Sequence, residues 1–352
     1  MKKNFQLGLI IALFVSILIA SCSPAATPSP APVVSEPTQV QNTEVPTQAT
    51  SKTDSEITVG VSYASLDLQF FQFYQKGIQE VAKELGVKLV EMDSFYDPEK
   101  QLANIETLIS QKVDAIIIHP VDEAAIVPAV EAANNAGIPV FALDRPPSGG
   151  KVDVYLSAGH DVIGPMQGEF IAKHLGGKGN VVLVQGPLGE SYTRKLDAGI
   201  KDVFKKYPDI KIIDEQSAGG WDRGKALAVM EDMIQKHGEQ INAVIATSDL
   251  LAMGAAEALK NAGLLEKVAI IGADADLDML QGIKRGEIAA TVDPQPFESG
   301  RIALRTAVLL AKGQPIPGLQ VINGVPTLEV PMLLVTKENV DETPEWGVVP
   351  LQ

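Results

Sequence analysis

The stretch VDAIIIHPVDEAAIVPAVEAANNAGIPVFALDR, residues 113–145, decides the fold class. It contains the run Asp114-Ala115-Ile116-Ile117-Ile118, whose continuous apolar character is typical of a strand buried on both faces. Residues 122–136 have a helical pattern that stops at Gly137, a residue favoured just after a helix ends, and residues 138–143 form a second apolar strand. The order strand, helix, strand predicts a βαβ unit with parallel strands.

The same alternation continues on both sides of this stretch. Upstream, the patterns predict strands over 57–61 and 87–92 and helices over 70–85 and 98–111. A second series begins near His160, with helices over 162–175, 191–207, 222–237, 250–262 and 277–284 and strands over 180–185, 210–215, 243–246, 268–272 and 289–292. A further helix over 297–312 and short strands near 320–322 and 328–334 can complete either series. We therefore predict an α/β fold of two doubly wound parallel-sheet domains.

The N-terminus has the pattern of a signal peptide, predicted over residues 1–21. Two lysines precede an apolar run over 7–20, which is shorter than the roughly 20 residues that a membrane span needs. The sequence Ile19-Ala20-Ser21-Cys22 resembles a bacterial lipobox, and Cys22 is the only cysteine, so it has no internal disulfide partner. The resemblance implies lipidation at Cys22 and an extracytoplasmic protein anchored to the bacterial cell membrane. An uncleaved anchor helix is the alternative.

Residues 22–55 are dominated by Pro, Thr, Ala, Val and Gln and contain no aromatic residue. A stretch of this kind buries too little apolar surface to offset its ordering entropy, and its prolines keep it extended. We predict a disordered tether that holds the folded body away from a membrane surface. Eukaryotic mucin-like stalks share the composition, but the lipobox favours a bacterial lipoprotein.

Composition and charge argue against several classes of function. The net charge of −15 makes nucleic acid a poor partner, because phosphate backbones repel an acidic protein. Four scattered histidines and one cysteine do not form a zinc-binding pattern, and neither a Walker loop nor a GxGxxG motif follows the first strand. We therefore predict no metal, no cofactor and no catalytic residue.

The candidate site lies just after the strands, because ligands of open α/β sheets bind outside the carboxyl ends of the strands. Asp144-Arg145 follows the apolar strand over 138–143 and offers a carboxylate and a guanidinium that can each make bidentate hydrogen bonds to sugar hydroxyls. Phe70, Phe71 and Trp221 can stack on the C–H faces of a sugar ring. The alternatives are a surface ion pair for Asp144-Arg145 and core packing for Phe70-Phe71.

Seven short motifs occur in the order seen in one family. The chain resembles the type I periplasmic sugar-binding proteins, the ribose-binding-like group of bacterial ABC importers. The motifs are Phe70-Phe71, Ala142-Leu143-Asp144-Arg145, Gln185-Gly186 leading to Arg194, Trp221-Asp222-Arg223, Ser248-Asp249, Gly272-Ala273-Asp274-Ala275 and Ala289-Ala290-Thr291-Val292. The resemblance places the sugar-contacting positions of the family on Phe70, Phe71, Asp144, Arg145, Trp221, Ser248 and Asp274. Arg194, Asp249 and Gln295 are added as candidates beside them.

The resemblance also implies a venus-flytrap architecture with three chain crossings between two lobes. The N-terminal lobe is predicted over residues 56–159 and 294–326, the C-terminal lobe over 160–293 and 327–340, and a tail over 341–352.

The chain departs from the ribose binders at several positions. The loop over 62–70 is about two residues longer, so Asp67 becomes a further candidate. Leu196 stands where those proteins have a second arginine, and Arg194 lies two positions away, on nearly the opposite side of a helix. Ser248, Ala273 and Pro294 replace an Asn, a Phe and a Gln of the family. The sequence therefore does not name the sugar.

These observations predict a monomeric solute-binding lipoprotein that captures a small sugar or polyol and delivers it to the transmembrane permease subunits of an ABC importer. A sensor subunit that presents ligand to a membrane receptor uses the same binding chemistry and stays open as an alternative. An extracellular glycoside-processing enzyme is a weaker one, since it needs two carboxylates across one bond. The regulators that share this fold need an N-terminal DNA-binding domain, and the predicted signal peptide occupies that place.

Overall fold

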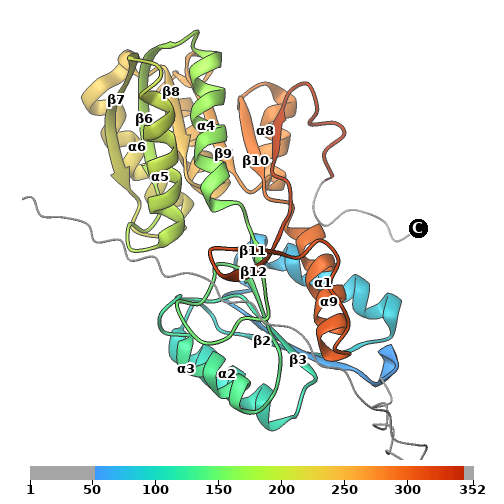
Figure 1. Ribbon diagram of the computed structural model, residues 1–352. Helices are drawn as coiled ribbons and strands as arrows, with labels where there is room; N and C mark the ends of the chain where they lie inside the picture. The colour runs from blue at the N-terminus through green and yellow to red at the C-terminus, as the bar shows by residue number, and fades with distance from the viewer. Residues whose placement is uncertain (1–51, 345–352) are drawn as a thin grey trace, which may run out of the picture. The chain divides into compact units, whose positions relative to one another are not determined.

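The structure, a computed structural model, describes residues 52–344 (Figure 1). Cys22, the predicted signal peptide over 1–21 and the predicted tether up to residue 51 lie outside the described residues, as do Trp346 and residues 345–352 of the predicted tail. Residues 52–55 of the predicted tether are described and contact the folded body, where Lys52 Nζ lies 2.5 Å from Asp114. In residues 52–344, no helix combines the length and the apolarity that crossing a bilayer requires.

The first domain is built on a seven-stranded sheet in the order β11-β12-β5-β4-β3-β1-β2. Its pairs are parallel except β11 with β12. The strands are β1 (Thr58–Tyr63), β2 (Lys88–Asp93), β3 (Ala115–Ile118), β4 (Val140–Asp144), β5 (Val154–Ser157), β11 (Gln320–Ile322) and β12 (Val325–Glu329). The helices are α1 (Gln69–Leu85), α2 (Pro98–Ser110), α3 (Val127–Asn135) and α9 (Pro296–Ala311), with a short 3-10 turn, η1 (Asp54–Glu56), before them.

The second domain has a six-stranded sheet in the order β13-β10-β9-β8-β6-β7, parallel except for the pair β13–β10. Its strands are β6 (Lys178–Gln185), β7 (Asp209–Ser217), β8 (Ala243–Ala246), β9 (Ala269–Ala273), β10 (Ala290–Asp293) and β13 (Leu333–Thr336). Its helices are α4 (His160–His174), α5 (Ser191–Phe204), α6 (Arg223–His237), α7 (Asp249–Asn261) and α8 (Leu277–Arg285), with 3-10 turns η2 (Gly238–Gln240) and η3 (Leu265–Lys267). The predicted fold class is confirmed.

Local predictions differ from the structure in three places. The four-residue strand β5 was not predicted, because VYLS is too short to show a pattern. The helix predicted from residue 122 begins at Val127, because the Asp122 carboxylate accepts hydrogen bonds from the N–H groups of Ala124 and Ala125 and forms a turn first. The strand predicted near 328–334 is two strands in two sheets, β12 and β13, separated by Pro331, which has no N–H to donate.

The chain passes between the two sheets three times. It does so between Ser157 and His160, between Asp293 and Pro296, and between Glu329 and Leu333. The third crossing differs from the predicted boundary at 326/327, which falls inside β12. Because β12 pairs with β5, residues up to Glu329 belong to the first domain.

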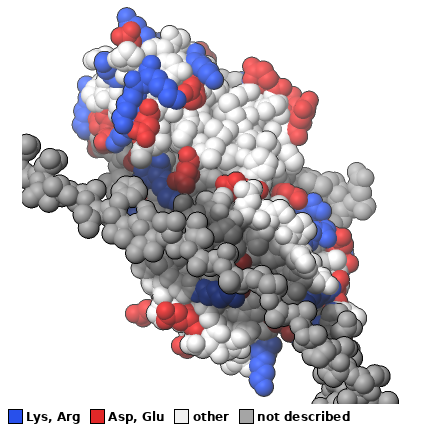
Figure 2. All heavy atoms as spheres, viewed as in Figure 1, with Lys and Arg blue, Asp and Glu red and all other residues white. Residues whose placement is uncertain are grey.

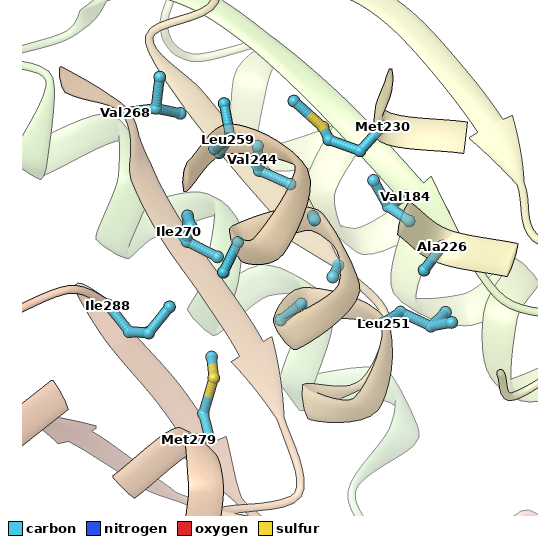
Figure 3. Packing of buried hydrophobic residues seen from close by; sticks show 14 of the residues in the cluster. Val184, Ala226, Met230, Val244, Leu251, Leu259, Val268, Ile270, Met279 and Ile288 are labelled. Atoms are coloured by element: carbon cyan, nitrogen blue, oxygen red, sulfur yellow. The ribbon is translucent and has the colours of Figure 1, made fainter. Parts of the chain in front are cut away.

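Apolar side chains fill the space between each sheet and its helices. In the second domain, Val184, Val244 and Ile270 from three adjacent strands face Met230 on α6 and Leu251 on α7, and all five are fully buried (Figure 3). The continuous apolar strands of the sequence are thus buried on both faces, as parallel sheets require.

Helices α1 and α9 pack side by side on the first domain (Figure 1). Their backbones approach so closely at Gly77 and Gly300 that a Cβ on Gly77 would lie 2.1 Å from the carbonyl oxygen of Phe297. This contact attaches α9, which follows the second domain in the chain, to the first.

Charged side chains are mixed on the face of the molecule seen in Figure 2. Lys and Arg side chains gather over α5 and β7, with Asp and Glu side chains between them. Lys201 lies 2.6 Å from Glu215, Lys205 lies 2.6 Å from Asp202, and Lys206 lies 3.3 Å from Glu169. Acidic neighbours therefore compensate the positive charges of these three lysines.

Candidate functional site

A cavity of about 290 Å³ lies at the carboxyl ends of strands from both sheets. Its size is at the lower end of the range for small-molecule sites. Residues of both domains line it: Asp67, Leu68, Gln69, Phe70, Phe71, Tyr96, Asp144, Arg145, Ala158, His160, Ile163, Tyr192, Trp221, Arg223, Ser248, Leu250, Met253, Asp274, Asp276, Asp278 and Pro294. The structure thus brings Phe70, Phe71, Asp144, Arg145, Trp221, Ser248 and Asp274 together, with Asp67 beside them.

Three candidate residues do not line this cavity. The Arg194 guanidinium is exposed and donates to the carbonyl oxygens of Leu188, at 3.1 Å, and Gly189. The Gln295 amide donates to the Pro331 carbonyl oxygen at 2.6 Å, between the second and third crossings. Asp249 is fully buried behind the cavity wall. These three were predicted as ligand-binding residues, and in this structure their side chains contact other parts of the protein and do not line the cavity.

Asp144 and Arg145 form a buried network with residues of the second domain. Only 5% of Asp144 and 7% of Arg145 is exposed, so the alternative of a surface ion pair is wrong. Asp144 Oδ2 lies 3.2 Å from Arg145 Nε, and Asp144 Oδ1 lies 2.9 Å from His160 Nε2. Burial opposes ionisation of Asp144, but His160 and Arg145 together hold its pKa below the usual range. Asp144 is therefore a carboxylate at neutral pH.

The Arg145 guanidinium reaches across to the second domain. Its Nη1 lies 3.2 Å from Glu190 Oε2 in the second domain. It also donates to the Tyr96 hydroxyl of the first domain at 3.1 Å. Burial raises the pKa of Glu190, whereas Arg145 and Trp221 lower it. Since the Trp221 indole N–H also donates to Glu190, at 3.2 Å, this one carboxyl joins the first-domain arginine to the second-domain indole.

The aromatic residues occupy the walls of the cavity. Phe71 is 3% exposed and makes edge contacts with Phe70 and His119, each at 5.3 Å between ring centroids, so core packing and cavity lining occur together at this position. Trp221 lies against the backbone of Gly186, where a Cβ would come within 2.4 Å of the indole. Its ring meets Tyr192 at 5.7 Å. Only glycine at position 186 leaves room for the indole in this place.

Sequence reasoning did not single out Tyr96, His160, Glu190, Tyr192 or Asp276 as ligand-binding candidates, although four of them lie in the segments after strands where ligands were expected. Tyr96, Glu190 and Tyr192 lie in loops or first helical turns directly after strands, within the segments that the position rule marks, but no local pattern distinguished them from their neighbours. His160 follows a crossing, and no local pattern marks it.

Several non-glycine residues at this end of the sheets have a positive φ. Asp144 has φ 68°, Tyr96 φ 59° and Asp274 φ 121°. Such conformations raise the energy of the folded state and tend to occur where a side chain is aimed for function. All three of these residues line the cavity.

Asp274 and Asp276 line the second-domain side of the cavity, and Asp249 lies behind them. Asp249 accepts a hydrogen bond from the Thr291 hydroxyl at 2.7 Å and another from the Asp276 backbone N–H at 2.9 Å, so it supports the loop that carries Asp274 and Asp276. The backbone N–H of Asp249 in turn donates to Asp274. Burial and the charge of Asp276 raise the pKa of both Asp249 and Asp274, and burial and Asp278 raise that of Asp276 to about 6.

The raised pKa of Asp276 predicts a pH-dependent effect of its removal. Because this carboxyl ionises near pH 3.8 when unfolded and near pH 6 when folded, its ionisation destabilises the folded state increasingly as pH rises between these values. Asp276→Asn is therefore expected to stabilise the unliganded protein above about pH 6, with a gain that shrinks toward zero near about pH 4. Urea unfolding of both proteins across this range measures the gain. If the difference in stability between the two proteins does not vary with pH, the raised pKa of Asp276 is contradicted.

In residues 52–344, no group of three or more His, Cys, Asp or Glu side chains has an arrangement suited to a metal ion.

A family model described as the periplasmic binding protein domain matches residues 59–315 of the chain. A curated relative, the ribose import binding protein of Bacillus subtilis (strain 168), is 35% identical over 316 residues, which are 90% of this chain and 95% of that protein.

Solved structures of ABC transporter solute-binding proteins match most of the chain. An ABC transporter solute-binding protein from Bacillus halodurans C-125 with bound myo-inositol is 29% identical, with a TM-score of 0.73, over 82% of this chain and 97% of that one. A periplasmic solute-binding protein from Actinobacillus succinogenes 130z with bound D-allose is also 29% identical, with a TM-score of 0.76, over 82% and 100% of the two chains.

Proposed function

Because this chain belongs to the periplasmic binding protein family, we propose that its two domains close over a small sugar or polyol and deliver it to an ABC importer. The observation that carries this proposal is the buried Asp144-Arg145 pair at the wall of a cavity lined from both domains. Its carboxylate accepts from vicinal hydroxyls while the aromatic side chains cover the apolar faces of a sugar ring. The family consists of solute-binding proteins rather than enzymes.

Contacts between the domains support capture by closure. Arg145 and Asp144 of the first domain meet Glu190 and His160 of the second at 3.2 Å and 2.9 Å. The Ser191 hydroxyl also donates to Glu123 of the first domain at 2.5 Å. Asp144, Arg145 and His160 line the cavity, so separation of the domains would open it. The three crossings provide the hinge for this motion.

A ligand screen by thermal shift tests the proposal. The mature chain is mixed with pentoses, hexoses, inositols and sugar alcohols, and a ligand at 100 times its Kd adds about 2.7 kcal/mol to folding stability. Ligands that shift the melting temperature are then examined by solution scattering, where closure should reduce the radius of gyration without a change in mass. A protein that responds to none of these compounds would contradict the proposal.

Trp221 provides a second prediction. The side chain lines the cavity and is partly exposed, so a bound ring should change its fluorescence. We expect this change to disappear in Trp221→Phe, with a modest loss of affinity because a ring remains. Trp221→Ala should weaken binding by about 1 to 3 kcal/mol, measured by calorimetry. Normal binding by Trp221→Ala together with a much lower melting temperature would make the indole a purely structural group.

Family membership implies an extracytoplasmic location, and we propose that a lipid on Cys22 holds the protein at the membrane. Replacing Cys22 by Ser is expected to release the protein into the periplasm or the medium, because no other cysteine can take the lipid. Fractionation of cells that express each form measures the release, with the body residue Asp161→Asn as a control for expression. Retention of the Cys22→Ser protein at the membrane would argue against the lipobox.

A further inference from the structure

We propose that the captured sugar or polyol carries a protonated amine, which Asp274 and Asp276 bind. This inference rests on the proposed function and narrows its ligand class. Its starting point is the charge of the cavity wall, where Asp67, Asp144, Asp274, Asp276 and Asp278 stand against two arginines. A ligand that carries a positive charge would complement this excess of carboxyl groups.

Both arginines already have acidic partners within the protein. Arg145 pairs with Asp144 and with Glu190, each at 3.2 Å. Arg223 Nη2 lies 3.1 Å from Glu257, and its Nη1 lies 3.5 Å from Asp278. The guanidinium charges are therefore compensated before any ligand binds, and neither arginine offsets Asp274 and Asp276.

Asp276 has an unfilled hydrogen-bonding capacity. It occupies the N-cap position of α8, where an aspartate usually accepts from the backbone N–H groups of its own helix, yet its side chain makes no such bond. Its Oδ1 is shielded from water and has no hydrogen-bond partner among the described residues. A buried acceptor without a donor is destabilising, and a ligand that brings a donor removes this penalty.

The surroundings of Asp274 and Asp276 favour a charged donor over a hydroxyl. Asp249 lies directly behind them and accepts from the Asp276 backbone N–H, so three carboxyl groups share one small region. Their raised pKa values report the burial and mutual repulsion of these groups. An ammonium group supplies three N–H donors and a positive charge, whereas a hydroxyl supplies one donor and no charge. An ammonium therefore lowers the repulsion between ionised carboxyl groups, and a hydroxyl does not.

Pairs of ligands that differ only in an amine distinguish binding of an ammonium group from binding of a hydroxyl group. Calorimetry at about pH 7 compares D-glucosamine with D-glucose and N-acetyl-D-glucosamine, and an inosamine with myo-inositol. We expect at least one amine to bind about 30-fold or more tightly than its neutral parent, as charge-assisted bonds in a buried site do. In Asp276→Asn this preference should fall below about threefold, while Asp161→Asn, which changes an exposed carboxylate outside the cavity, should preserve it.

The outcomes distinguish this inference from the proposed function. If neutral sugars or polyols bind as tightly as their amines, the proposal of an amine ligand is wrong and the proposed capture of a sugar or polyol is unaffected. A preference for an amine that survives in Asp276→Asn would overturn the assignment to this carboxyl. If neither the neutral compounds nor the amines bind, both proposals fail. The comparison of ligands on the unaltered protein decides the amine question even if Asp276→Asn folds poorly.

Discussion

Replacing Asp144 by Ala is expected to weaken ligand binding by about 30-fold or more and to lower folding stability by about 3 to 5 kcal/mol. The carboxylate lies between the Arg145 guanidinium at 3.2 Å and the His160 ring at 2.9 Å, and it is 5% exposed. Its removal leaves a buried guanidinium beside the ligand with one fewer carboxylate partner. It also removes two acceptors for ligand hydroxyls, so binding and folding suffer together.

Calorimetry and urea unfolding of Asp144→Ala measure the two losses separately. Asp161→Ala is the matched control, because Asp161 is 79% exposed, follows His160 directly and does not line the cavity. It should change neither quantity by more than about 0.5 kcal/mol. Affinity of Asp144→Ala within about threefold of the unaltered protein, a difference of less than 1 kcal/mol, would give Asp144 a structural role only.

Replacing Gly77 by Ala is expected to destabilise the protein by about 3 kcal/mol or more, at the upper end of the range for overpacking. The new Cβ would lie 2.1 Å from the Phe297 carbonyl oxygen and 3.1 Å from the Arg301 backbone nitrogen. Both are backbone atoms of α9, so no side-chain rotation relieves the clash and the two helices must separate. Because Phe70 and Phe71 lie in the first turn of α1, ligand affinity should fall as well.

The sign of the effect makes Gly77→Ala informative. In a helix free of such contacts, Gly→Ala would stabilise by about 1 kcal/mol through helix propensity. Gly189→Ala is a suitable control, since a Cβ there has no atom within 4 Å and the residue does not have a positive φ. Urea unfolding of both variants gives the comparison. A Gly77→Ala protein as stable as the parent would show that α1 and α9 separate easily.

The sequence predicts the fold because its strands and helices are strongly patterned. The apolar run at Ile116-Ile117-Ile118 lies between two helical patterns and is typical of a buried strand. The rule that ligands bind at the carboxyl ends of strands then leads to Asp144 and Trp221. What it does not contain is the direction of a side chain on a loop or a first helical turn. At Arg194 the helical spacing did give the direction, because the buried Leu196 fixes the rotation of α5 and Arg194 points to the surface. No such spacing rule applies to Gln295, whose amide donates to the Pro331 carbonyl oxygen.

Contacts between side chains that are distant in sequence could not be predicted either. Glu190 joins Arg145 to Trp221, and no local pattern links three residues from three separate loops. Asp249 was expected at the ligand because it follows a strand, yet its two oxygens support Thr291 and the backbone of Asp276. In both cases the tertiary contact decides what the side chain does, and that contact depends on how the loops are placed.

The third crossing has a consequence for biosynthesis. The first domain lacks α9 and the edge strands β11 and β12 until the ribosome has reached Glu329, although its β1 strand ends at Tyr63. At about 5 to 20 residues per second, translation leaves this domain incomplete for on the order of tens of seconds. Non-local contacts such as those between α1 and α9 also slow folding. The first domain therefore reaches its final form only when synthesis is nearly finished, since its last strand ends at Glu329.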